Sequence, residues 1–186
     1  MAIREPGVTH AISDTGPLIS IFQSNSLALV TTLLPVIHIP PMCVEELIRH
    51  GWGESLQSAG SRIESHFLTQ AEEEIARTIA RQIALHPLSR DPVVDNHLGE
   101  AQAIALAARP EFVNDVLLVD ELAARMVAEQ MGLTISGFAG VLLVAVQEGL
   151  LTASELKERL EVCRQQGTHY SEAFVEQVYL AAKGDR

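Results

Sequence analysis

Four acidic residues of the sequence could bring carboxylates together at one place, namely Asp14, Glu46, Glu100 and Asp120. Asp14 and Asp120 each end a short apolar run, and Glu46 and Glu100 lie in the first two turns of segments with helical spacing. Carboxylates that converge repel one another, and a bound divalent metal ion is the usual remedy. Because oxygen-only ligand sets favour Mg²⁺ or Mn²⁺ over zinc, the pattern predicts a Mg²⁺ or Mn²⁺ site formed by these four residues.

Each acid also has a simpler interpretation when it is taken alone. Asp14 and Asp120 could cap the helices that follow them, since Asp is a favoured N-cap residue. Glu46 and Glu100 could complement the positive ends of their helices. Glu121 could pair with Arg125 one helical turn later. A metal site is the interpretation that explains why acids recur in four separate segments.

Short apolar runs alternate with helical patterns along the chain, and these elements must position the acids. Strands are predicted at 10–14, 36–40, 115–120 and 133–136, and helices at 17–22, 26–34, 41–50, 71–86, 98–109, 121–132, 137–151, 153–166 and 171–183. Segment 52–66 is ambiguous, and 87–97 is typical of a loop with room for a short strand. The alternation predicts an α/β fold with a parallel sheet covered on both sides, in which ligands bind at the carboxyl ends of the strands.

The tripeptide Asp14-Thr15-Gly16 also occurs in aspartic proteases, where two carboxylates share a proton. Those proteases are all-β proteins, whereas this sequence is mostly helical in pattern, and Pro17 favours the start of a helix. A phosphatase of the haloacid dehalogenase type would need Asp-x-Asp after the first strand, and this sequence does not supply it. The sequence therefore argues against both enzyme classes.

Length and composition indicate a single domain over residues 1–186, with 152–186 as a C-terminal helical extension. The chain is 47% hydrophobic and only 4% aromatic, and its net charge of −11 gives no global attraction for nucleic acid. Cys43 and Cys163 match no metal or redox spacing and are expected to be reduced thiols. No apolar run suggests a signal peptide or a membrane span, so a cytoplasmic location is expected.

Four blocks of the sequence together resemble the PIN-domain family. They are DTGPLI, IPPMCVEEL, GEAQAIALA and LLVDELAARMVAEQMGL, and they occur in the order typical of a bacterial and archaeal branch related to toxin–antitoxin ribonucleases. The resemblance implies a three-layer α/β/α sandwich and Mg²⁺- or Mn²⁺-dependent hydrolysis of single-stranded RNA. It also implies that Asp14, Glu46, Glu100 and Asp120 are the catalytic and metal-binding acids, and that Glu121 is a further metal ligand.

The sequence departs from this branch at two positions. His97 stands where an Asp is expected three residues before Glu100, with Asp95 nearby, and Ser136-Gly137 offers no late acid. These departures leave room for a second hypothesis, a catalytically weak or inactive PIN-like module that acts through protein or RNA contacts. His38, alone in a strand, is expected to be a packed residue.

Substrate contacts must come from local groups because the global charge is negative. Thr15, Arg49, Arg125 and Ser136 are the candidate substrate-binding residues. The expected partners are RNA, an antitoxin protein and a second copy of the chain in a homodimer.

Overall fold

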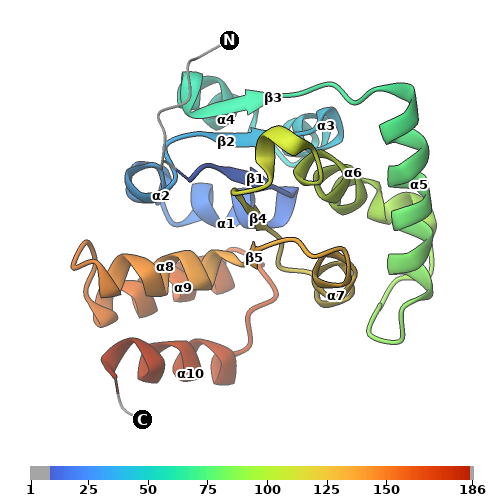
Figure 1. The fold of residues 1–186 in the computed structure, drawn as a ribbon. Helices are drawn as coiled ribbons and strands as arrows, with labels where there is room; N and C mark the ends of the chain where they lie inside the picture. The colour runs from blue at the N-terminus through green and yellow to red at the C-terminus, as the bar shows by residue number, and fades with distance from the viewer. Residues whose placement is uncertain (1–8, 185–186) are drawn as a thin grey trace.

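The computed structural model describes residues 9–184 and contains a five-stranded parallel sheet (Figure 1). Its strands are β1 (Ala11–Ser13), β2 (Ile37–Ile39), β3 (Ile63–Ser65), β4 (Val116–Leu118) and β5 (Ile135–Ser136). The strands lie side by side in the order β3-β2-β1-β4-β5, and each neighbouring pair is parallel. Strand β1 is therefore central, and the segment that follows it begins at the middle of the edge formed by the carboxyl ends of the strands.

Helices cover both faces of the sheet and give the three layers that the sequence predicts. One apolar cluster joins the sheet to α1 (Thr15–Gln23), α2 (Leu27–Leu33), α3 (Pro41–Arg49), α4 (Gly53–Ala59), α8 (Phe138–Gln147), α9 (Ala153–Gln165) and α10 (Glu172–Lys183). The second cluster joins the opposite face to α5 (Gln70–Leu85), α6 (Leu98–Ala107) and α7 (Leu122–Gln130). Figure 1 shows α5 and α7 on one side and α8, α9 and α10 on the other.

Successive residues of β1 and β4 point to opposite faces of the sheet, so each of these strands contributes to both apolar clusters. Ile37 and Ile39 of β2 face the first cluster, whereas Ile12 of β1 and Leu117 of β4 face the second. All four side chains are at most 1% exposed. Burial on both faces explains why β4, Val116–Leu118, is an apolar run, whereas β2 carries the polar His38 between its two isoleucines.

Two segments differ from the sequence-based expectation. The ambiguous stretch 52–66 forms α4, the 3₁₀ turn η1 (Gly60–Arg62) and β3, with Gly60 at a φ of 58°. Residues 87–97 contain no strand and end in the 3₁₀ turn η2 (Val94–His97), and a further turn, η3 (Pro110–Phe112), precedes β4. The edge strand β3 has the sequence Ile-Glu-Ser with only Ile63 buried, so no apolar run marks it in the sequence.

The C-terminal helices α9 and α10 bury their apolar faces against α8 and α1. Thr152 and Glu155 form a capping box that starts α9, so this boundary is set locally. The predicted domain limits of 1 and 186 lie outside the described residues. None of the helices in residues 9–184 has the length and apolar character needed to cross a bilayer.

Candidate active site

Asp14 lies between the end of β1 and the start of α1, at the carboxyl edge of the sheet. Its backbone N–H donates to Leu118 O of β4 at 3.0 Å, which extends the sheet by one residue. Its carboxylate accepts a long hydrogen bond of 3.4 Å from Gly16 N, so Asp14 is also the N-cap of α1. Asp14 is 6% exposed. Burial raises the pKa of Asp14 well above its usual value, and the charges of Glu100 and Glu46 raise it further.

Glu46, on α3, reaches the same place from the neighbouring strand connection. Thr15 Oγ1 donates a hydrogen bond of 2.5 Å to Glu46 Oε2. The same carboxylate lies against Gly99, where a Cβ atom would come within 3.0 Å of Oε2. Gly99 therefore leaves the space that lets Glu46 approach the first turn of α6.

Glu100 completes a group of three interacting carboxylates from β1, α3 and α6. Burial raises the pKa of Glu100 to about 7, and the charges of Glu46, Glu121 and Asp91 also raise it. Within residues 9–184, no Lys or Arg forms an ion pair with Asp14, Glu46 or Glu100. This donor set fits a hard divalent cation, because an oxygen-only ligand set with unbalanced negative charge is what Mg²⁺ or Mn²⁺ would neutralise.

Asp120 lies just after β4 but has a different set of partners. Its Oδ1 accepts from Phe138 N at 3.2 Å and its Oδ2 accepts from Tyr170 Oη at 3.0 Å. Burial raises the pKa of Asp120, while Tyr170, Phe138 and the charge of Arg125 lower it. Asp120 is thus held toward the start of α8 and the segment before α10.

Glu121 is the N-cap of α7, a role that the simpler interpretation of the sequence gave to Asp120. It is Glu121, and not Asp120, that caps α7, through a 2.6 Å hydrogen bond from Ala124 N. Among the described residues Glu121 and Arg125 form no ion pair, and Arg125 Nη1 donates instead to Val119 O at 3.0 Å. The charge of Glu121 also raises the pKa of Glu100, although Glu121 is a helix cap.

The candidate substrate-binding residues differ in burial and in whether their polar atoms already have partners. Thr15 is buried and is committed to Glu46, and Ser136 Oγ turns back to Gly137 O at 3.1 Å. Arg125 is half-buried beside Asp120, whereas Arg49 is exposed in the last turn of α3. Of these four, the two arginines keep groups that an incoming phosphate could reach.

His97 replaces an expected acid and has a structural partner. Its Nε2 lies 2.8 Å from Asp91 O and 3.5 Å from Ser89 Oγ, so the ring holds the loop before α6. His97 Nδ1 is buried and has no hydrogen-bond partner within residues 9–184. The acid that does influence Glu100 from this loop is Asp91, which is fixed by Val93 N and Asn96 Nδ2.

Tyr170 and Gly137 are the residues at this site that the sequence pattern did not single out. Tyr170 is 50 residues from Asp120, and no local spacing relates the two. Gly137 stood out only as a position without an acid. In the structure, a Cβ atom at Gly137 would overlap Asp120 Oδ1.

A model of one protein family, described as a PIN domain, matches residues 10–183. The chain belongs to the PIN-domain family. PIN domains are generally nucleases, and both the family and the three-layer fold implied by the sequence are confirmed. Comparisons of this PIN domain with curated proteins and with solved structures gave no significant match.

Substituting Glu100 by Gln is expected to stabilise the metal-free PIN domain at alkaline pH. A carboxyl group whose folded pKa of about 7 exceeds its unfolded value makes the protein lose stability as pH rises between those two values. Gln cannot ionise, so Glu100→Gln should gain on the order of 2 kcal/mol near pH 8 and almost nothing near pH 4. Urea unfolding with chelator at both pH values measures this.

The exposed neighbour Glu45 provides the matched control. Glu45→Gln should leave the free energy of unfolding unchanged at both pH values, because an exposed charge is well solvated. Equal responses of the two variants would show that Glu100 is not in a repulsive cluster.

Proposed function

We propose that this PIN domain is a Mg²⁺- or Mn²⁺-dependent endoribonuclease that hydrolyses single-stranded RNA. The observation that carries the proposal is the group formed by Asp14, Glu46 and Glu100. Glu100 and Glu46 raise the pKa of Asp14, Glu46 raises the pKa of Glu100, and none of the three has a basic partner in the described residues. Excess negative charge of this kind has no use in a structural ion pair, whereas it is what a catalytic metal site requires.

Asp14, Glu46 and Glu100 would hold the metal, with Asp120 and Glu121 at its margin. A divalent ion so placed supplies an activated water at neutral pH and neutralises charge on phosphate oxygens. The protein residues do the positioning. Thr15 fixes one oxygen of Glu46, and the Phe138 N–H and the Tyr170 hydroxyl fix Asp120.

Substrate affinity in this proposal is local. The net charge of −11 repels a polyanion at a distance, so contacts by Arg49 and Arg125 near the site must orient the RNA. A role as the toxin of a toxin–antitoxin pair, with an antitoxin protein as partner, is proposed on the sequence resemblance alone, as is a homodimer.

Cleavage of a fluorescent single-stranded RNA is expected to need Mg²⁺ or Mn²⁺ and to stop when a chelator is added. The reason is that the acids alone offer no nucleophile and only repel phosphate. Adding back Mn²⁺ in excess of the chelator should restore the rate. Cleavage that survives chelation in several independent preparations would contradict a metal-dependent mechanism.

A non-catalytic PIN-like module is the second candidate, and the partners of Asp120 favour it. Both oxygens of this carboxylate already accept hydrogen bonds from the protein. In that case the protein would bind RNA but would not cleave it, whichever divalent metal is added. A gel-shift measurement of RNA binding, made beside the cleavage assay, separates the two functions.

A further inference from the structure

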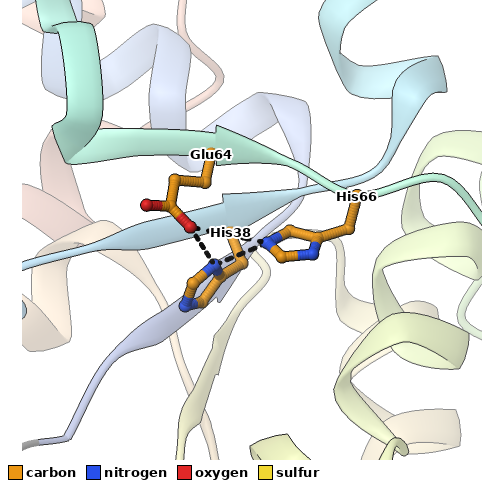
Figure 2. A group of neighbouring side chains, drawn as sticks. All are labelled: His38, Glu64 and His66. Atoms are coloured by element: carbon orange, nitrogen blue, oxygen red, sulfur yellow. Dashed lines mark hydrogen bonds and ion pairs between the residues drawn. The ribbon is translucent and has the colours of Figure 1, made fainter. Parts of the chain in front are cut away.

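A second group of metal-binding side chains lies at the edge of the sheet, where β2 and β3 run side by side (Figure 2). His38 comes from the middle of β2, Glu64 pairs with it from β3, and His66 follows β3 directly. One ligand atom of each residue lies within 4.8 Å of the others. None of the three residues is among the main groups that shift the pKa of Asp14, Glu100 or Asp120, so this cluster is distinct from the acidic site.

The distances in the cluster are close to those of a tetrahedral ligand set. His38 Nδ1 lies 2.8 Å from His66 Nε2, and Glu64 Oε2 lies 3.8 Å and 3.9 Å from these two atoms. With zinc–ligand bonds of about 2.0–2.1 Å, ligand atoms of a tetrahedral site stand about 3.3 Å apart. Each observed separation differs from this by about 0.6 Å or less, which side-chain rotation supplies without backbone movement. Figure 2 shows the three side chains pointing toward one another.

His10 lies on the far side of the His38 ring and can fix its orientation. His38 Nε2 is 3.2 Å from His10 Nδ1, and the backbone N–H of His10 is held by Asp115 Oδ1 at 2.8 Å. In the tautomer that protonates His38 Nε2, this nitrogen donates to His10 and Nδ1 presents its lone pair to the cluster. A histidine ligand whose other nitrogen donates to a neighbouring acceptor is the usual arrangement around protein-bound zinc.

The surroundings favour a metal of intermediate softness. His38 is 6% exposed, its ring lies 4.8 Å from the Phe112 ring, and Phe112 also contacts the His66 ring. Two imidazoles with one carboxylate suit Zn²⁺, whereas Mg²⁺ prefers oxygen ligands alone.

We propose that His38, Glu64 and His66 form a zinc site that joins the edge strand β3 to β2, with a fourth position open to solvent. The half-exposed positions of Glu64 and His66 give the ion a route of entry. A zinc ion at this place links the short strand β3 to the body of the sheet. The inference does not depend on nuclease activity and concerns a different metal from the acidic site.

Zinc binding is measured by equilibrium dialysis and metal analysis on the full chain, with Mg²⁺ in excess to fill the acidic site. The wild type should bind one Zn²⁺ per chain and show a rise in melting temperature that Mg²⁺ alone does not give. His66→Gln should weaken Zn²⁺ binding by about 100-fold or more, since even loss of a group that only supports a ligand costs about 10–100-fold. His10→Gln should weaken Zn²⁺ binding by about 10-fold or more, because His10 supports the ligand His38.

Two further proteins make the result decisive. His169→Gln changes an exposed histidine of the α9–α10 connection and should bind Zn²⁺ as the wild type does. Asp14→Asn should also keep the zinc, because it alters only the acidic site. The visible spectrum of Co²⁺ substituted for zinc should show tetrahedral coordination in the wild type and lose it in His66→Gln.

The proposal is overturned if the wild type binds no zinc under these conditions. It is equally overturned if His66→Gln retains the ion while Asp14→Asn loses it, since zinc would then occupy the acidic site. Melting curves without metal show whether each variant is folded, and His66 is partly exposed, so its substitution leaves the core intact.

Discussion

The Asp14→Asn variant is expected to lose metal-dependent RNA cleavage by about 100-fold or more and to be more stable than the wild type without metal at neutral pH. Removing one electrostatic group from a catalytic centre typically costs a factor of about 10²–10³. Asp14 is the central member of the cluster because it ends the middle strand and is influenced by both Glu46 and Glu100. Its replacement by Asn would remove the buried carboxylate that we propose as a metal ligand.

The stability expectation follows from the raised pKa of Asp14. A buried carboxyl with a raised pKa destabilises the folded state increasingly as pH rises above its unfolded pKa, so a neutral Asn should stabilise the metal-free protein at neutral pH. Asn can still accept the hydrogen bond from Gly16 N that caps α1. If Asp14 were only a cap, Asn would change neither stability nor metal response.

Melting curves of Asp14→Asn and wild type, each with chelator and with Mn²⁺, measure both effects. A ligand at about 100 times its dissociation constant stabilises the wild type by about 2.7 kcal/mol, and the variant should gain much less. Asp95→Asn changes an exposed acid of η2 and should behave as the wild type does. An unchanged Mn²⁺ response in Asp14→Asn would remove Asp14 from the metal site.

Much of the fold follows from the sequence because the strands are buried on both faces. Runs such as 115–120 and the helices between them carry enough apolar residues to identify a parallel sheet, and Asp14 follows the first strand by position alone. The start of α1 could also be predicted, since Pro17 shortly after Asp14 favours the start of a helix. Strand β3 could not, because its residues Ile63-Glu64-Ser65 contain a single buried apolar side chain and form no apolar run.

Only part of the candidate site could be predicted from the sequence. Order along the chain indicates that Asp14 and Asp120 follow strands, whereas Glu46 and Glu100 were assigned from their positions early in helices and from the family resemblance. The sequence does not indicate in which direction a carboxylate side chain points. Asp120 turns toward Phe138 N and Tyr170, and these hydrogen bonds depend on how α10 packs against α8. Tertiary packing of this kind leaves no mark in local spacing.

The histidine cluster illustrates the same limit from the opposite side. His38 was expected to be a packed residue, and it is buried. Its neighbours Glu64 and His66 lie in a segment whose structure was ambiguous from the sequence. Only the register of β2 with β3, in which His38 pairs with Glu64, shows that the three residues meet.

Substituting Gly137 by Ala is expected to destabilise the protein by about 1–3 kcal/mol and to abolish cleavage, because it forces Asp120 out of place. Gly137 is the N-cap of α8 with a φ of −111°, so Ala causes no backbone strain there. The added Cβ atom would instead overlap Asp120 Oδ1 and come within 3.3 Å of Arg125 Nη1. Moving the carboxylate breaks its hydrogen bond from Phe138 N and leaves buried polar groups without partners.

A double-mutant cycle with Asp120→Ala identifies the cause of the effect. If the clash with Asp120 is responsible, Gly137→Ala should cost little further stability once the carboxylate has been removed, with a coupling of about 1 kcal/mol or more. Gly53→Ala is the matched control, since a Cβ there would meet only Ile48 Cγ1 at an ordinary 3.7 Å. Urea unfolding gives the four free energies. Additive costs in the cycle would mean that Gly137 is required for another reason and that its missing side chain does not make room for Asp120.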